Sequence, residues 1–157
     1  MFYLGLYIQK FCNFRTLLKE LNIKKQENIL DTAEKNALKT IKDLETKRWE
    51  SIEEMDSINS QMKKMLYEII KKNQKNTSAL INLGAIYCDG GKFEKALEYL
   101  NLAQDLKSED KNLFLNLGYV SINLQKEEKV WKAYFKSAEG KIADPLTFEA
   151  YFDPHAH

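Results

Sequence analysis

The tripeptide Asn-Leu-Gly stands at residues 82–84 and returns at residues 116–118. A fixed period of this size, about 34 residues, is typical of proteins built from stacked helical hairpins. Residues 77–110 can be laid over residues 111–144 without a gap. In this overlay Leu100 falls on Tyr134, and Ala103 falls on Ser137. The period therefore predicts two neighbouring copies of one helix-turn-helix unit.

The residues of the first copy suit such a unit. Gly84 has no side chain, so a second helix can approach it closely. Leu83 and Tyr87 are four residues apart and share one helix face. Gly90 and Gly91 supply the permissive backbone that a tight turn between two helices needs. We expect two antiparallel helices joined at this glycine pair.

This arrangement resembles the tetratricopeptide repeat (TPR), a helix-turn-helix unit of the same length. The resemblance rests on Leu80, Leu83, Gly84, Tyr87, Gly90, Gly91, Phe93, Ala96, Leu100 and Ala103. The second copy departs from the pattern, with Ser121 for tyrosine, Leu124-Gln125 for the glycine turn and Val130 for alanine. The resemblance covers residues 77–138. It implies an all-α fold, a short α-solenoid of antiparallel helix-turn-helix repeats.

The resemblance also implies a binding surface, because the first helix of each TPR unit lines a concave groove. The positions concerned are Ser78, Ile81, Ala85 and Cys88, then Asn112, Leu115, Asn116, Tyr119, Ile122 and Asn123. Chaperone-binding TPR proteins hold a peptide carboxylate with lysine and asparagine here. Ile81 and Ala85 occupy two of those positions and only Asn116 agrees, so we expect no carboxylate clamp. The predicted groove is apolar with one tyrosine, which suits an apolar helix or peptide.

Residues 1–21 predict an amphipathic helix. Apolar residues recur at helical spacing, at Tyr3, Tyr7, Phe11, Phe14, Leu18 and Leu21. The polar residues 22–28 predict a connection, and Asp31 with Glu34 has the spacing of a capping box. The aromatic stripe has two possible uses. It could fill the groove or pair two protomers, or else the groove binds an apolar segment of another chain.

Apolar residues continue at helical spacing through residues 33–69, as one helix or two. The only plausible break lies at residues 56–60, where no glycine or proline supports it. In the frame of the repeat, Leu66 and Ile69 fall on Leu100 and Ala103. Residues 43–76 are therefore either a degenerate first repeat, which we favour, or a helix that caps the stack.

A further helix is predicted at the C-terminal end. Gly140 ends a helix, and Asp144 followed by Pro145 is a typical helix start. Phe148, Tyr151 and Phe152 would form its apolar face. We expect residues 145–157 to form a capping helix and tail that close the array.

Composition excludes several classes of function. The net charge of +1 over 157 residues gives no field that would attract nucleic acid. Cys12 and Cys88 form no disulfide framework. The apolar residues 1–8 are too few for a membrane span and lack the marks of a signal peptide. We expect a cytoplasmic protein that binds neither nucleic acid nor a membrane.

No catalytic constellation is present in the sequence. The only histidines, His155 and His157, lie at the end of the chain, so no nucleophile-histidine pair is supported. With Asp153 they are the one candidate metal site, but a tetrahedral site needs further ligands. We expect no catalytic residues, no cofactor and no metal.

The sequence therefore predicts a non-enzymatic protein-interaction module, an adaptor, small chaperone or inhibitor that binds a protein or peptide with an apolar segment. Self-association through the N-terminal aromatic helix is the other partnership considered. An alternative function is a regulatory sensor that binds a small peptide or nucleic acid.

Overall fold

The computed structural model describes residues 2–50 and 52–150, and the side chains of residue 16 and of residues 19–50 and 53–150. Over these residues the chain is all-helical and contains no strand. It divides into two units, one ending at Asn36 and one beginning at Ala37. We call residues 37–150 the repeat unit.

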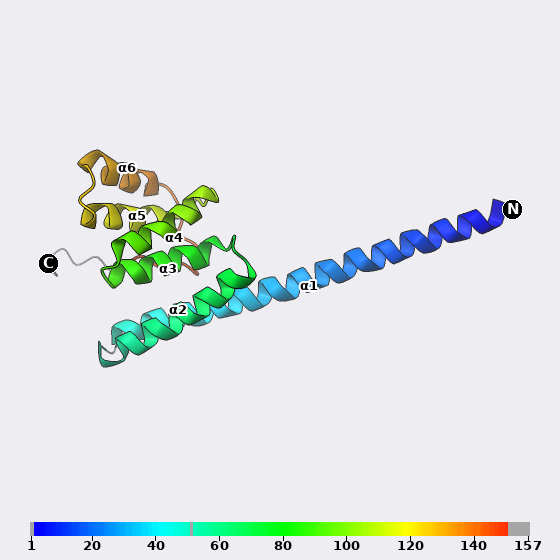
Figure 1. Cartoon of the computed structure of the whole chain (residues 1–157), viewed down its shortest axis with the longest axis horizontal. Coiled ribbons are helices and arrows are strands. Elements are labelled where there is room, and N and C mark those ends of the chain that lie inside the picture. Colours follow the sequence, from blue (N-terminus) through cyan, green and yellow to red (C-terminus); the bar gives the residue numbers. More distant parts are fainter. Residues whose placement is uncertain (1, 51, 151–157) are drawn as a thin grey trace. The chain divides into compact units, whose positions relative to one another are not determined.

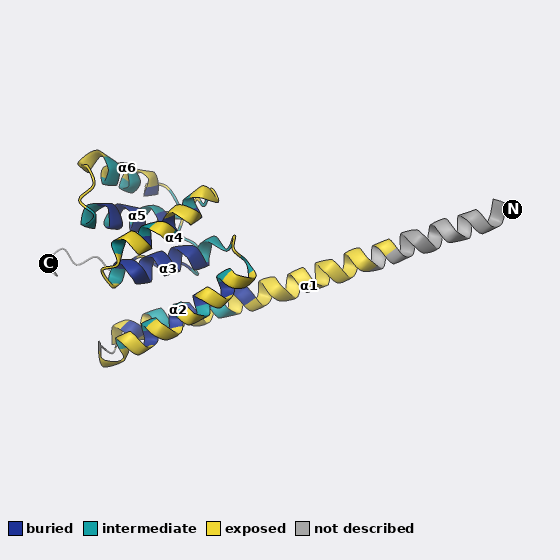
Figure 2. Cartoon of the chain, in the orientation of Figure 1, coloured by how far each residue is buried: buried dark blue, intermediate teal, exposed yellow. Residues whose placement is uncertain are grey.

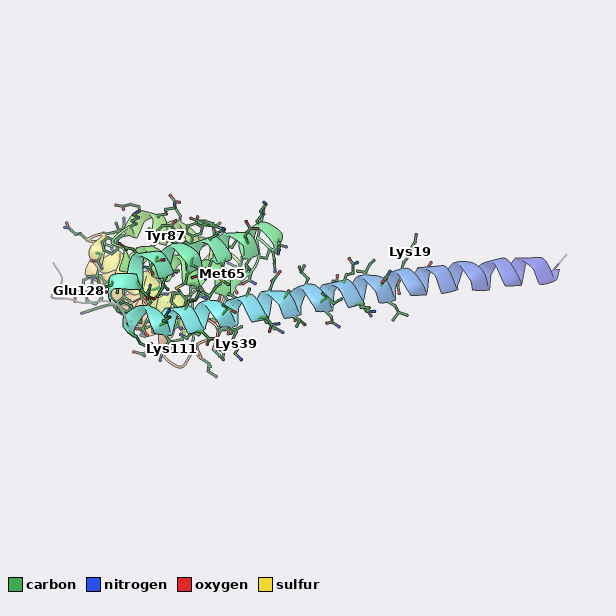
Figure 3. The ribbon with its side chains drawn as sticks, turned by 90° about the horizontal axis from the view of Figure 1, so that it is seen from below. Lys19, Lys39, Met65, Tyr87, Lys111 and Glu128 are labelled. Atoms are coloured by element: carbon green, nitrogen blue, oxygen red, sulfur yellow. The ribbon has the colours of Figure 1, made fainter. Side chains whose placement is uncertain are left out.

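Helix α1 runs without interruption from Phe2 to Glu50. The connection predicted at residues 22–28 and the helix start predicted at Asp31 are therefore wrong. No glycine or proline occurs between residues 6 and 50, and the polar residues are mostly good helix formers. Asp31 instead pairs with Lys35 one turn later, at 2.8 Å. Side chains project around this part of α1, Lys19 among them (Figure 3).

A short 3₁₀ turn, η1 (Ile52–Glu54), separates α1 from α2 (Met55–Lys72). The predicted break at residues 56–60 is thus a few residues too late. Asp56 lies in the first turn of α2, where a carboxylate is favourable to the helix dipole. Leu66 and Ile69 are buried, as are their counterparts one period later, Leu100 and Ala103. Helix α2 thus matches the second helix of a repeat, but no helix begins near residue 43.

Two helical hairpins follow, as the period predicted. The first consists of α3 (Thr77–Asp89) and α4 (Phe93–Asp105), and the second of α5 (Lys111–Asn123) and α6 (Glu128–Ala138). Both ends of α5 lie one period after the corresponding ends of α3. The helices of each hairpin pack against each other, and α3 also packs against α2 and α5 (Figure 1).

The two interhelical turns have the same backbone. Lys92 N donates to Tyr87 O, and one period later Lys126 N donates to Ser121 O, both at 2.9 Å. The residue before each donor is left-handed, with φ of +67° at Gly91 and +51° at Gln125. Glycine adopts this conformation without strain and glutamine does not. The second copy therefore keeps the turn without its glycine.

The helices of each hairpin approach each other at a glycine. A Cβ atom at Gly84 would lie 2.5 Å from Leu100 Cγ, and one at Gly118 would lie 2.6 Å from Phe135 Cε1. The close approach predicted at Gly84 is confirmed. The gapless overlay is wrong in the last helix, however, because it placed Tyr134 rather than Phe135 opposite Leu100. Helix α6 is shifted by one residue, which also makes Ala138, not Ser137, the buried counterpart of Ala103.

Burial follows the inner helices of the repeat unit. All residues from Ala79 to Cys88 in α3 are buried, whereas α4 and α6 each have an exposed face (Figure 2). The core also takes in Leu38 and Ile41 of α1 and Phe148 near the C-terminal end. Among the described helices, none has a stretch long and apolar enough to cross a membrane.

The capping helix predicted at residues 145–157 is wrong over its described part. The last helix before Ala150 is α6, and residues 147–150 have no regular helix or strand hydrogen bonding. Asp144 does begin a turn, since Thr147 N donates to Asp144 O at 3.0 Å. Beyond this turn the backbone bonds to side chains of α3 and α5 rather than within a helix of its own.

Candidate peptide-binding groove

Residues 144–150, which we call the C-terminal segment, lie along the face made by α3 and α5. Asn82 of α3 binds the backbone of this segment with both ends of its amide. Its Nδ2 donates to Leu146 O at 2.8 Å, and its Oδ1 accepts from Phe148 N at 3.0 Å. The Asn82 side chain is fully buried. One amide therefore satisfies a carbonyl and the N–H two residues later.

Asn116 of α5 repeats this contact two residues further along the segment. Its Nδ2 donates to Phe148 O at 3.3 Å, and its Oδ1 accepts from Ala150 N at 2.7 Å. Asn116 is also fully buried. The first residues of the two repeated tripeptides thus bond at two-residue steps to the backbone of the C-terminal segment, an arrangement that we call the asparagine ladder. Both asparagines contact backbone atoms only, so these bonds do not depend on which side chains the segment carries.

Thr147 of the segment forms hydrogen bonds with other side chains. The Thr147 hydroxyl accepts from Asn112 Nδ2 at 3.0 Å, and its proton can go to Asp110 Oδ2 at 3.0 Å or to Asp144 O at 2.9 Å. Lys42 of α1 donates to Thr147 O at 3.3 Å. Thr147 is buried, so a hydroxyl here needs these partners. This position therefore distinguishes a hydroxyl from a methyl group, which the asparagine ladder cannot do.

Asp110 joins the second repeat to the segment. Its carboxylate caps α5 by accepting from Asn112 N at 2.7 Å, and it also accepts from Asp144 N at 3.1 Å. Burial raises the pKa of the Asp110 carboxyl, and the hydrogen bonds from Asn112, Asp144 and Thr147 oppose that rise. Burial outweighs these donors, so the neutral form of Asp110 is more favourable in the folded chain than in the unfolded chain.

Asp144 stands one period after Asp110, at the position where a third repeat would begin. Its Oδ1 accepts from Leu146 N at 2.8 Å, as the Asp110 carboxylate does from Asn112 N. Its Oδ2 accepts from the Ser78 hydroxyl at 3.0 Å. The helix-start signal is therefore real at the level of the turn, but the chain enters the groove instead of continuing as a helix.

Phe148 is the anchor of the segment, since it is only 2% exposed. Lys42 Nζ and the Arg48 guanidinium carbon lie 5.5 and 5.9 Å from its ring centroid. Arg48 is itself buried and pairs with Asp89 of α3 at 2.6 Å. The aromatic pocket is thus bordered by cations on α1, which favour the face of an aromatic ring.

The predicted groove residues divide into three groups. Ser78, Asn112, Asn116 and Tyr119 bond to the segment, the last through Glu149. Ile81, Ala85 and Cys88 are buried in the core, and Leu115 and Ile122 are half-buried. Asn123 bonds back to Tyr119 O in its own helix. The predicted apolar character is therefore wrong at the positions that hold the segment, where the contacts are polar.

Four residues that hold the segment were missed: Asn82, Asp110, Lys42 and Arg48. The sequence does point to Asn82, because it is the first residue of the repeated tripeptide and returns one period later as Asn116. It does not point to Lys42 and Arg48. They lie among many charged residues of α1 and reach the groove only through the packing of distant segments.

Other predicted features involve the two ends of the chain. The candidate metal pair His155 and His157 and the capping residues Tyr151 and Phe152 lie outside the described residues. So do the side chains of the N-terminal stripe, apart from exposed Leu21. Within the part of the chain that the structure describes, no cluster of three His, Cys, Asp or Glu side chains could hold a metal ion. Burial raises the pKa of the Cys88 thiol to about 12, which keeps it protonated.

Comparison with known protein families, with curated proteins and with solved structures gives no match for this chain.

Proposed function

We propose that the repeat unit is a TPR-like protein-interaction module whose groove binds an extended peptide segment. The observation that carries this proposal is the asparagine ladder. Asn82 and Asn116 together satisfy four backbone groups of one strand, at residues 146, 148 and 150. This arrangement suits a peptide ligand because main-chain bonds supply affinity and side-chain pockets supply specificity.

In this chain the C-terminal segment occupies the ladder, so a partner binds by replacing it. The segment is joined to the core by side-chain contacts and lies after the last helix. Leu146 is half-buried, Thr147, Phe148 and Ala150 are buried, and Glu149 is exposed. A partner segment with the same pattern of burial would meet the same backbone donors and acceptors. The function is therefore binding by exchange, with the chain's own segment as the competitor.

The test uses the full chain with its own segment weakened by Phe148→Ala. A fluorescent peptide of residues 142–150 serves as the probe, and binding is followed by anisotropy. We expect Phe148→Ala to bind the probe at least about tenfold more tightly than the parent chain, because the competing anchor is gone. Adding Asn82→Ala should weaken binding about tenfold or more, since a buried peptide group loses its partners.

Asn101→Ala is the matched control, because Asn101 is an exposed asparagine on α4. It should leave probe binding unchanged. Thr147→Ala replaces Phe148→Ala as the opened form if the latter does not fold. A folded, opened chain that does not bind the probe would overturn the proposed function.

A further inference from the structure

Side chains beside the ladder add a sequence preference to backbone binding. The inference rests on the proposed function and names the kind of segment that the groove accepts. Three features of the C-terminal segment are read by side chains that lie off the ladder. They are a carboxylate at the entry turn, a buried hydroxyl and a buried aromatic ring, at residues 144, 147 and 148.

The hydroxyl site is built for both a donor and an acceptor. Asn112 donates to the Thr147 hydroxyl oxygen at 3.0 Å. The hydroxyl proton has two acceptors within reach, Asp110 Oδ2 at 3.0 Å and Asp144 O of the segment itself at 2.9 Å. A valine in this position would leave a partly buried carboxylate and a buried amide without that partner. Sites that bond to a hydroxyl reject the methyl analogue strongly, because their polar groups remain unpaired.

The adjacent aromatic site lies on the other side of the strand. Successive side chains of an extended segment point to opposite faces. Thr147 meets Asp110 and Asn112, whereas Phe148 meets Lys42 and Arg48 of α1. An aliphatic side chain fills part of this pocket but offers no ring face to the two cations. The two sites therefore read a dipeptide in one register.

We propose that the groove selects partner segments of the form Asp-x-x-(Thr or Ser)-aromatic, bound in the extended conformation. Ser78 receives the aspartate at the entry turn, Asp110 and Asn112 receive the hydroxyl, and the pocket beside Lys42 and Arg48 receives the ring. The partner is a protein that displays this sequence in a segment free to become extended. The C-terminal segment is this chain's own copy of the motif.

The test measures a series of competitor peptides against the Phe148→Ala chain loaded with the fluorescent 142–150 probe. Thr147→Val and Phe148→Leu peptides should each bind about 10- to 100-fold more weakly than the unchanged peptide, and Thr147→Ser within about threefold. A phosphothreonine peptide should not compete, because its charge would face the Asp110 carboxylate.

A protein variant links the preference to the named residue. In the Phe148→Ala chain, Asp110→Asn should reduce the discrimination between threonine and valine peptides at least about fivefold, because the site loses its charged acceptor. Asp105→Asn, at the exposed end of α4, is the matched control and should leave the discrimination unchanged. Equal binding of all peptides would overturn the selectivity but leave the proposed function intact. Failure of every peptide, the unchanged one included, would overturn both.

Discussion

The two hairpins of the repeat unit share one plan but differ in which parts are repeated accurately. Helices α3 and α5 and the turns that follow them match in helix length, turn hydrogen bonds and ladder asparagine. The outer helices α4 and α6 do not, since α6 is shifted by one residue. The inner helices must align two amides along one strand, whereas an outer helix must only cover its partner. The 34-residue register is therefore kept in the helices that bond to the C-terminal segment, and it is not kept in the outer helices.

The largest difference in stability between equivalent substitutions is expected at the glycine contacts of the two hairpins. Gly84→Ala should lower the free energy of unfolding by about 2 kcal/mol, because the new Cβ meets the fully buried Leu100. Gly118→Ala should cost about 1 kcal/mol or less, because the half-buried Phe135 ring has room to move. The gain in helix propensity is the same for both. Urea unfolding measures the two values, and an equal or reversed loss would contradict the comparison.

Substitutions in the two interhelical turns should change the stability in opposite directions. Gly91→Ala should destabilise the fold by about 1 kcal/mol, because alanine is strained at a φ of +67°. Gln125→Gly should stabilise it by several tenths of a kcal/mol, because it relieves the same strain in the second hairpin. Thermal unfolding reports both shifts. Gly90→Ala is the control, since the φ of Gly90 is −85° and it should show no such strain. Destabilisation by Gln125→Gly would show that its side chain matters more than its backbone.

The residues that cap the inner helices differ in charge, with Asn76 on α3 and Asp110 on α5. The pKa of Asp110 is raised by burial, so its contribution to stability is greatest below its unfolded pKa of 3.8 and is lost as pH rises through the higher folded value. Relative to Asp110→Asn, the parent chain should therefore gain stability as pH falls through this range. Urea midpoints of both proteins across pH 3.5–7 test the sign. A constant difference between them would contradict it.

The smallest difference between the two hairpins is expected in the exposure of one pair of equivalent positions, Cys88 and Ile122. It is measured as the reactivity of a thiol at each position. With a pKa of about 12 and a buried position, Cys88 should react with a disulfide reagent at pH 8 only when the repeat unit opens. Half-buried Ile122→Cys should react at least about tenfold faster. Both are measured in a Cys12→Ser background, with Cys88→Ser added for the second. Rapid reaction of Cys88 in the folded chain would contradict the assigned burial.

Sequence reasoning predicted the repeated hairpins because period, glycine contact and turn are local signals. The register of α6 was missed because a single added residue after the turn leaves no mark in a helix of mixed composition. The uninterrupted α1 was missed because a polar stretch of good helix formers resembles a loop in hydropathy alone.

Several residues predicted to line a groove contact the C-terminal segment, but the polar nature of these contacts was not predicted. The inner faces of α3 and α5 were identified, yet Asn82 was treated as a marker of the repeat rather than as a binding group. The capping helix failed for a related reason. Asp144-Pro145 carries the local signal for a helix start, but the backbone of residues 146–150 is bonded by Asn82 and Asn116 instead. A local signal cannot report a partner that lies 64 residues away in the chain.

The asparagine ladder relates the number of repeats in the protein to the number of segment residues that the repeats hold. One period of the repeat advances the bound strand by a single dipeptide, from the bonds of Asn82 to those of Asn116. An added copy of the repeat with its asparagine would therefore lengthen the held stretch of backbone by one dipeptide and leave its existing register unchanged. The length of backbone that such an array can hold is thus a discrete quantity, which changes by two residues for each duplicated repeat.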